Sequence, residues 1–379
     1  MASSILILSS DTGGGHRSAA NALKDSFINL YPDEVLVNIT QVLEEAGTVP
    51  RRLGEAYNYL LRHHQDLMKY YYWLINQFRP NESKWILKGA LQYGLRLLDR
   101  VTPDAVVSVH PMTQHLYAYL LKRLGLQDRV PLVTVVTDPY NGFWKGWACD
   151  DVQKYYVATD EAKAQLVHYG VASEKISVQG MPVHSRFQPV TDDEQRQIRC
   201  ELGLNPDSFT VLINAGWVGG GNIPEILKSL AASDLPIQVL YVCGRSEELL
   251  IEGHQLASQA NFPIHVYGFR NDLERLMNAS DVMVSKLGGL TTFEALATRL
   301  PVIADVTTTP MPQEAATARF IEQSGAGHLL TKPHELAPYL NVLLHDPEKR
   351  RKMREAACLH GSPGASDTIA DNILAMIER

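Results

Sequence analysis

A histidine stands directly after three consecutive glycines, Gly13, Gly14 and Gly15, in the stretch SSDTGGGHRSAANAL. An apolar segment precedes this loop and a helical pattern follows it, so His16 is expected at the N-terminus of a helix. The positive end of the helix dipole would lower the pKa of His16 and favour the neutral imidazole. A neutral histidine in a cleft can act as a general base, whereas the alternative is a tight turn that carries a surface histidine.

The glycines of this loop do not fit the common nucleotide-binding patterns. No GxxxxGK[ST] P-loop occurs in the chain. Gly13 and Gly15 match the first half of a dinucleotide fingerprint, but Ser18 stands where its third glycine belongs. The second apolar segment, VLVNIT, also lacks an acidic residue for the ribose. The loop therefore argues against NAD and indicates close backbone approach by another ligand.

Two further polar side chains follow apolar segments of the first half of the chain. His110 comes directly after VVSV, and Asp138 follows VTVVT. The carboxyl ends of parallel strands lie at one edge of a sheet, so both residues are expected to face the same rim as His16. Taken singly, each such residue is more often a turn residue or a helix cap than a catalyst.

A second glycine turn follows the apolar segment that ends at Ser285, in SKLGGLTTFEAL. Gly288 and Gly289 form this turn, and a helix is expected to begin near Thr291. The N–H groups of that helix start, with the hydroxyls of Thr291 and Thr292, could hold a diphosphate.

Glu294 lies one turn into the same expected helix and could accept hydrogen bonds from a ribose. The pattern Thr291-x-x-Glu294 is equally a capping box, which needs no ligand. Gln313 and Glu314 begin another expected helix after two prolines, and such a pair can bind vicinal sugar hydroxyls. The alternative for this pair is an ordinary acidic first helical turn.

Short apolar segments alternate with amphipathic stretches, which indicates strand–helix–strand units. Several segments are continuously apolar, as are strands buried on both faces of a parallel sheet. The predicted fold class is therefore α/β, with two Rossmann-like, doubly wound domains. The expected strands are residues 5–8, 35–39, 105–109, 132–136, 155–158, 176–178, 209–214, 237–242, 264–267, 282–285 and 302–304.

The pattern restarts after a polar segment at residues 188–207, with FTVLINA, the turn GWVGGG and a helical stretch. Because this order of strand, glycine turn and helix repeats the order at the start of the chain, we predict an N-terminal domain at 1–190 and a C-terminal domain at 191–360. A final helix at 361–379 is expected to pack back on the N-terminal domain. Gly219 and Gly220 belong to the second opening turn. Ligands bind beyond the carboxyl ends of such strands, so the site is expected in a cleft between the two domains.

Composition excludes several classes of protein. The chain has 379 residues and a net charge of −7, which argues against a nucleic-acid binder. Its four cysteines are scattered and contain no CxxC pair, so they are expected to be reduced thiols in a cytosolic protein, with no zinc site. The N-terminal MASSILILSS lacks a basic region and is expected to form a strand, and no apolar run is long enough to span a membrane.

Residues 51–100 are locally basic and rich in aromatic side chains. They contain nine Lys or Arg against four Asp or Glu, and nine of the thirty aromatics, among them Tyr70, Tyr71, Tyr72, Trp73 and Trp85. Basic and aromatic residues interleaved on helices suit an anionic membrane surface. A helical subdomain that packs these aromatics as core is an equally strong interpretation, and nucleic acid is a weaker one.

Taken together, these motifs resemble one family in their order along the chain. The stretches SSDTGGGHRSAANAL, VVSVHPM, GMPVHSRF, VCGRSEEL, GFRNDLERLMNASDVMVSKLGGLTTFEAL and LPVIADVTTTPMPQEAATARFI follow the order seen in the monogalactosyldiacylglycerol synthase and processive diacylglycerol glucosyltransferase family. That family is related to the peptidoglycan transferase that adds N-acetylglucosamine to a lipid-linked precursor. The resemblance covers roughly residues 3–326 and implies a GT-B fold, with the acceptor on the N-terminal domain and a UDP-sugar on the C-terminal one.

The resemblance also implies roles for individual residues. His16 falls on the family's proposed base, which activates the lipid hydroxyl. The stretch 285–292 matches the loop that grips the donor diphosphate, and Glu294 matches the acid that holds the ribose. Gln313 and Glu314 match the pair that binds the donor sugar, while the backbone at Gly268 and Phe269 would face uracil. This chain departs from the usual Gly-Pro-Gly-Thr of the diphosphate loop, where it has Gly-Gly-Leu-Thr at 288–291.

The combined expectation is an inverting glycosyltransferase that moves a hexose from UDP to a lipid hydroxyl, with diacylglycerol as the acceptor. No D-x-D occurs in the chain, and a helix N-terminus can stabilise a leaving diphosphate, so no metal or other cofactor is expected. The expected location is cytoplasmic, peripheral on the inner face of the cell membrane. The alternatives are transfer of N-acetylglucosamine to another lipid, a UDP-sugar epimerase or hydrolase on the same fold, and a UDP-sugar sensor without turnover.

Overall fold

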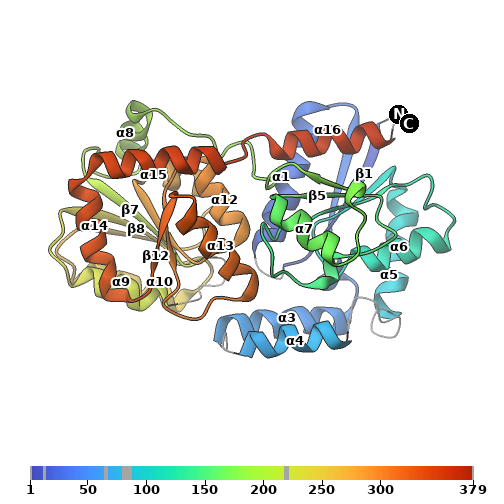
Figure 1. Ribbon diagram of the computed structural model, residues 1–379, viewed down its shortest axis with the longest axis horizontal. Helices are drawn as coiled ribbons and strands as arrows, with labels where there is room; N and C mark the ends of the chain where they lie inside the picture. The colour runs from blue at the N-terminus through green and yellow to red at the C-terminus, as the bar shows by residue number, and fades with distance from the viewer. Residues whose placement is uncertain (1, 12–13, 64–66, 79–87, 217–221, 378–379) are drawn as a thin grey trace. The chain divides into compact units, whose positions relative to one another are not determined.

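The computed structural model divides the chain into two compact units, and it describes residues 2–11, 14–63, 67–78, 88–216 and 222–377. Unit 1 consists of residues 1–185 together with 362–379, and unit 2 consists of residues 186–361 (Figure 1). Each unit is built around a six-stranded sheet in which every pairing is parallel. The predicted α/β class with two doubly wound sheets is confirmed.

The sheet of unit 1 has the strand order β2-β1-β3-β4-β5-β6. The chain starts in β1, the second strand from one edge, adds β2 on the outer side and then β3 on the inner side, so the carboxyl ends of β1 and β3 define a topological switch point. The strands are β1 (Ser3–Ser9), β2 (Val35–Gln41), β3 (Ala105–Ser108), β4 (Leu132–Val135), β5 (Lys154–Val157) and β6 (Ile176–Val178).

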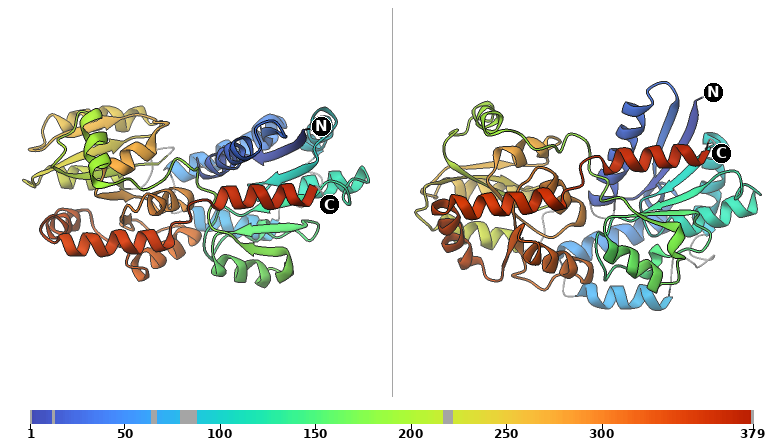
Figure 2. Two further views of the ribbon diagram at one scale, coloured as in Figure 1. Left: turned by 90° about the horizontal axis from the view of Figure 1, so that it is seen from above. Right: turned by 45° about the horizontal axis from the view of Figure 1, so that its top comes forward.

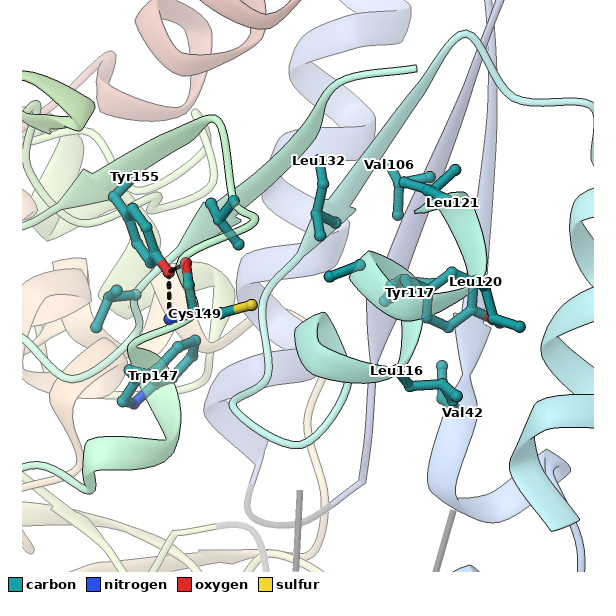
Figure 3. Close-up of a cluster of buried hydrophobic side chains, with 14 of the residues drawn as sticks. Val42, Val106, Leu116, Tyr117, Leu120, Leu121, Leu132, Trp147, Cys149 and Tyr155 are labelled. Atoms are coloured by element: carbon teal, nitrogen blue, oxygen red, sulfur yellow. Dashed lines mark hydrogen bonds between the residues drawn. The ribbon is translucent and has the colours of Figure 1, made fainter. Parts of the chain in front are cut away.

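Helices cover both faces of this sheet, because successive side chains along β1 are apolar and point to opposite faces. Ile5 and Ile7 pack on the side of α1 and α16, whereas Leu6 and Leu8 face the opposite core, part of which Figure 3 shows. In that second core the Tyr155 hydroxyl donates to the Cys149 carbonyl and accepts from the Cys149 N–H. The helices of unit 1 are α1 (Gly14–Leu30), α2 (Val42–Glu45), α3 (Thr48–His63), α4 (Met68–Phe78), α5 (Lys88–Val101), α6 (Gln114–Arg123), α7 (Asp160–His168) and α16 (Ala365–Ile377).

The sheet of unit 2 has the order β12-β11-β10-β7-β8-β9. Its strands are β7 (Phe209–Asn214), β8 (Ile237–Val242), β9 (Ile264–Tyr267), β10 (Val282–Ser285), β11 (Val302–Asp305) and β12 (Gly327–Leu330). Its helices are α8 (Asp192–Glu201), α9 (Ile223–Ala231), α10 (Glu247–Ala257), α11 (Leu273–Ala279), α12 (Gly289–Ala297), α13 (Pro312–Gln323), α14 (Leu336–His345) and α15 (Pro347–His360).

All of the predicted strands are present to within one or two residues, and β12 is an additional strand that the sequence did not predict. The polar segment at 188–207, expected between the domains, lies within unit 2. Its helix α8 is held to the start of β10, because Arg199 donates to the Ala279 carbonyl and pairs with Asp281 at 2.8 Å. Within the described residues, none of the helices is long and apolar enough to cross a membrane.

Candidate functional site

His16 lies in the first turn of α1, where the backbone of unit 1 fixes one of its two ring nitrogens. Its Nδ1 atom is 2.7 Å from the Val109 carbonyl oxygen and 2.9 Å from the Thr137 hydroxyl. A carbonyl oxygen only accepts hydrogen bonds, so Nδ1 carries the proton. The Nε2 atom therefore keeps its lone pair, which is the atom that a general base needs.

The imidazole of His16 is neutral at physiological pH. Burial lowers its pKa to about 4, and the hydrogen bond to the Val109 carbonyl opposes that shift only in part. The predicted direction of the shift is confirmed. The cause differs from the expectation, because loss of water around the ring produces the shift instead of the helix dipole.

The structure brings the other predicted residues of unit 1 next to His16. The ring of His110, which is 4% exposed, lies edge-on to that of His16 with the ring centroids 4.5 Å apart. The indole of Trp147 is 6.1 Å from His16 and donates to the Asp138 carboxylate at 2.8 Å. His110 thus contacts the base directly, whereas Asp138 reaches it through Trp147, which the sequence did not single out.

The glycine loop itself is held by a residue that sequence reasoning missed. Glu44, in the short helix α2 that follows β2, accepts hydrogen bonds from the Ser10 hydroxyl at 2.8 Å and from the Asp11 N–H at 2.9 Å. Gly14 and Gly15 form the first turn of α1 and so belong to the helix. Gly13 lies outside the described residues.

In unit 2, the predicted diphosphate turn joins β10 to α12 as expected, but the helix begins earlier. Gly288 is the residue before the first helical one, and α12 starts at Gly289 instead of near Thr291. The capping box between Thr291 and Glu294 is therefore not formed. Thr292 donates to the Gly288 carbonyl at 3.0 Å, and Glu294 is buried in mid-helix.

Gln313 and Glu314 occupy the first turn of α13, as predicted. Glu314 accepts a hydrogen bond from the Met311 N–H at 3.1 Å, so it caps the helix in addition to any contact with a ligand. Burial raises the pKa of Glu314, while the nearby ammonium of Lys286 opposes the rise. Lys286 follows β10 directly and lies within the stretch 285–292 that the resemblance matches to the diphosphate loop.

Phe269 follows β9 and is 45% exposed, with the guanidinium carbon of Arg245 5.2 Å from its ring centroid. An aromatic ring beyond the carboxyl end of a strand can stack on a flat ligand such as a nucleobase. Gly219 and Gly220, the glycines expected to contribute to the same site, lie outside the described residues. Across the part of the chain that the structure describes, no group of three or more His, Cys, Asp or Glu side chains could hold a metal ion.

Comparison with known families assigns each half of the chain to glycosyl transfer. Residues 16–183 match the family described as monogalactosyldiacylglycerol (MGDG) synthase, and residues 195–359 match the glycosyl transferases group 1. The first match begins at His16, whose tautomer is fixed by the Val109 carbonyl.

Individual relatives agree with these matches. Monogalactosyldiacylglycerol synthase 3 of Arabidopsis thaliana is 30% identical over 97% of this chain and 80% of its own length. The probable monogalactosyldiacylglycerol synthase 3 of Oryza sativa subsp. japonica is 30% identical over 98% of this chain and 74% of its own length. Among solved structures, Acinetobacter baumannii MurG has a TM-score of 0.65 at 18% identity, over 99% of this chain and 100% of its own. That likeness establishes the GT-B fold.

Proposed function

Because the chain belongs to the monogalactosyldiacylglycerol synthase family of glycosyltransferases, we propose that it transfers a hexose from a UDP-sugar to the hydroxyl of diacylglycerol. The product is a glycosyldiacylglycerol, and transfer inverts the anomeric centre from α to β. The observation that carries this proposal is the arrangement at His16, whose Nδ1 is occupied and whose Nε2 is left as the proton acceptor.

In the proposed reaction the lipid hydroxyl oxygen attacks the anomeric carbon of the donor sugar. As the new C–O bond forms, Nε2 of His16 accepts the hydroxyl proton, and the bond from the anomeric carbon to the diphosphate breaks. UDP leaves with the bonding electrons. A base whose pKa is about 4 is fully available at neutral pH, although it is a weaker acceptor than an ordinary histidine.

The donor is proposed to bind unit 2 at the carboxyl ends of its strands. Phe269 lies beside the uracil, and Glu294 binds the ribose. The N–H groups at the start of α12, around Gly289, bind the diphosphate, because the positive end of a helix dipole favours an anion. Gln313 and Glu314 bind the hydroxyls of the sugar.

The proposal is tested by replacing the base and following sugar transfer into lipid. Vesicles containing diacylglycerol are incubated in turn with radiolabelled UDP-glucose, UDP-galactose and UDP-N-acetylglucosamine. We expect label in the lipid phase from one hexose donor, and a fall in kcat of at least about 100-fold in His16→Ala. UDP affinity is expected to stay unchanged, because its ligands lie on unit 2.

The matched control is His168→Ala, which removes an exposed histidine at the end of α7. Near-normal turnover in His16→Ala with UDP binding intact would remove His16 from the mechanism. Release of free sugar, or its epimerisation, without lipid acceptor would instead support a hydrolase or epimerase. Label that enters lipid only from UDP-N-acetylglucosamine would support the alternative transferase.

We further propose that unit 1 binds an anionic membrane surface through an exposed aromatic face of α4. Tyr70, Leu74 and Phe78 follow one another at four-residue spacing, which places them on one side of the helix. Phe78 is 71% exposed and the neighbouring Trp73 is 62% exposed, so these side chains are not core. Trp85, counted in the same cluster, lies outside the described residues.

The surroundings of α4 support a membrane-surface role. α4 runs beside α3, and the rings of Tyr57 and Tyr71 join the two helices with their centroids 5.6 Å apart (Figure 1). Arg51 and Arg52 at the start of α3 are exposed and can face anionic headgroups. The proposed location is cytoplasmic and peripheral, on the inner face of the cell membrane.

Flotation with vesicles that contain or lack an anionic phospholipid tests this surface. The double variant Trp73→Ser, Phe78→Ser is expected to lose most of the wild-type binding, because it removes the two most exposed aromatic side chains of the face. Leu359→Ser, which changes an exposed leucine at the end of α15, is the control. Unchanged flotation of the double variant would exclude α4 as the binding surface.

A further inference from the structure

His110 lies in a closely hydrogen-bonded turn just beyond the carboxyl end of β3. Its carbonyl accepts hydrogen bonds from the Thr113 N–H at 3.2 Å and from the Thr113 hydroxyl at 3.0 Å, while its own N–H lies 3.4 Å from the Ser108 hydroxyl. Ser108 and Thr113 are fully buried. The backbone of His110 is therefore held on both sides, which fixes the position from which its side chain starts.

The imidazole of His110 has a defined tautomer. The Met112 N–H donates to its Nδ1 at 3.2 Å. A backbone N–H can only donate, so Nδ1 is the nitrogen that carries the lone pair. Burial keeps the pKa of His110 well below its usual range, so the ring is neutral and its one proton lies on Nε2. The Nε2 atom of His110 is therefore a hydrogen-bond donor.

His16 and His110 thus have opposite hydrogen-bonding characters at adjacent positions. The Val109 carbonyl fixes the proton of His16 on Nδ1, which leaves its Nε2 as an acceptor. In His110 the Nε2 atom is the donor. The ring centroids are 4.5 Å apart and the ring planes differ by 73°, so one small group of ligand atoms can reach both rings. Two histidines in the same tautomer would offer two acceptors or two donors instead.

We propose that His110 recognises the acceptor lipid by donating its Nε2 proton to the carbonyl oxygen of the ester next to the reacting hydroxyl. This inference rests on the proposed function and adds the feature by which the acceptor is selected. In 1,2-diacylglycerol the hydroxyl donates a proton, and the ester on the neighbouring carbon has a carbonyl oxygen that accepts one. A hydroxyl beside an ester carbonyl therefore matches the acceptor of His16 and the donor of His110.

The ester carbonyl is a better partner for His110 than the attacking hydroxyl oxygen itself. An N–H bound to the attacking oxygen would hold the electron pair that has to form the new C–O bond, whereas an N–H on the ester leaves that pair to react. The surroundings also strengthen recognition, because His110 is only 4% exposed and the buried indole of Trp147 covers part of His16. In such a desolvated position, a hydrogen-bond donor discriminates against ligands that lack its acceptor.

The test compares two lipids that differ in the ester carbonyls, 1,2-dioleoylglycerol and its diether analogue, in vesicles of the same phospholipid. For the wild type we expect kcat/KM to be about three- to tenfold higher with the diester, as for one neutral hydrogen bond. His110→Asn is expected to lose this preference, because its side-chain oxygen can still accept from the Met112 N–H but no donor remains at the place of Nε2. His110→Gln is expected to keep the preference, because its amide N–H₂ lies near that place.

The ratio of the two kcat/KM values separates recognition from folding, since general damage lowers turnover with both lipids equally. His168→Asn, at the exposed end of α7, is the control and should keep the wild-type ratio. His110→Phe provides a second variant without a donor. An equal ratio in the wild type and His110→Asn, a wild-type ratio near one, or loss of all turnover in both variants without a donor would overturn the role of His110. A wild type that transfers sugar to neither lipid would overturn the proposed function itself, which is a separate outcome.

Discussion

At the scale of the single residue, two groups contact the Nδ1 atom of His16: the Val109 carbonyl oxygen and the Thr137 hydroxyl. The contribution of Thr137 can be tested separately. Thr137→Val keeps the shape of the side chain but removes the hydroxyl that lies 2.9 Å from Nδ1. Loss of one neutral hydrogen bond of about 0.5–1.5 kcal/mol should loosen the ring and lower kcat about two- to tenfold, with KM unchanged.

Steady-state kinetics on vesicles measure this effect, and Thr137→Ser is the matched control because it keeps the hydroxyl. A pH–rate profile adds a readout that general loss of packing would not produce, since the apparent pKa of the base should move in Thr137→Val alone. Equal kinetics and equal profiles for the valine and serine variants would show that the Val109 carbonyl is sufficient to orient His16.

The lowered pKa of His16 also predicts how stability depends on pH. Histidines in an unfolded chain titrate near about 6.5, whereas burial sets the pKa of His16 at about 4 and lowers that of His110 as well. Between these values the unfolded chain binds protons that the folded protein does not. The free energy of unfolding should therefore fall as the pH decreases from about 6.5 toward 4.

Urea unfolding at several pH values between 7 and about 4.5 measures this dependence. The variant His16→Gln removes one of the two buried titrating rings, so it is expected to lose less stability on acidification than the wild type does. The exposed His168 provides the control variant His168→Gln. Parallel pH curves for wild type and His16→Gln would contradict the burial of a neutral His16.

Sequence reasoning identified His16 because a glycine loop before a helix is a local pattern. It missed Glu44 and Thr137 for a common physical reason. Each acts through a contact with residues far along the chain, such as the 34 positions that separate Glu44 from Ser10 or the 121 that separate Thr137 from His16. Such partners are defined by the sheet and not by local spacing.

At the scale of elements, two differences from prediction have identifiable causes. The start of α12 was placed near Thr291 because a threonine followed by a glutamate three residues later is a strong helix-start signal. In the structure the helix begins two residues earlier, at Gly289, directly after the turn at Gly288. β12 was missed because its four residues, GHLL, begin with glycine and show only one fully buried side chain, Leu330.

Gly327 at the start of β12 nevertheless has a steric requirement that can be tested. A Cβ atom placed on Gly327 would lie 1.9 Å from the Val302 carbonyl oxygen and 2.6 Å from the side chain of Ile321. Because the Val302 carbonyl oxygen belongs to the backbone, it cannot move aside as a side chain could. Gly327→Ala should therefore destabilise unit 2 by about 1–3 kcal/mol.

Hydrogen exchange of the β11 and β12 amides measures the effect locally. The control is Gly89→Ala in α5, where the nearest atom to the added Cβ is the Ala46 carbonyl oxygen at 3.9 Å. That substitution should be neutral or stabilising, because alanine favours a helix over glycine by roughly 1 kcal/mol. Unaltered protection of β12 in Gly327→Ala would mean that the strand can shift away from β11.

At the scale of the whole molecule, the chain leaves unit 1 after Ser185, forms all of unit 2, and returns at Ser362. The returning segment ends in α16, which packs along α1 (Figure 2). Ile369 and Ile373 of α16 are fully buried in the core that also contains Leu23. The last helix of the sequence is thus part of the first domain.

Ile373→Ala should therefore destabilise unit 1 and leave unit 2 unchanged. Truncation of a buried isoleucine costs about 2–5 kcal/mol. Hydrogen exchange resolved by peptide should show faster exchange in β1 and α1 but not in β7 and β8. Leu359→Ala at an exposed position of α15 is the control and should change stability by no more than about 0.5 kcal/mol. Equal losses in both units would show that they unfold as one.

The return of α16 to unit 1 also constrains the order in which the two units can complete their folding during synthesis. During synthesis, residues 186–361 emerge as one continuous stretch, so unit 2 has all of its strands before the ribosome finishes. Unit 1 is begun first but lacks part of the cover of one sheet face, the buried side chains of α16, until residues 365–377 are released. The core of unit 1 on the side of α1 is therefore completed only after the whole second unit has been synthesised, and until then the apolar surface that α16 covers stays exposed.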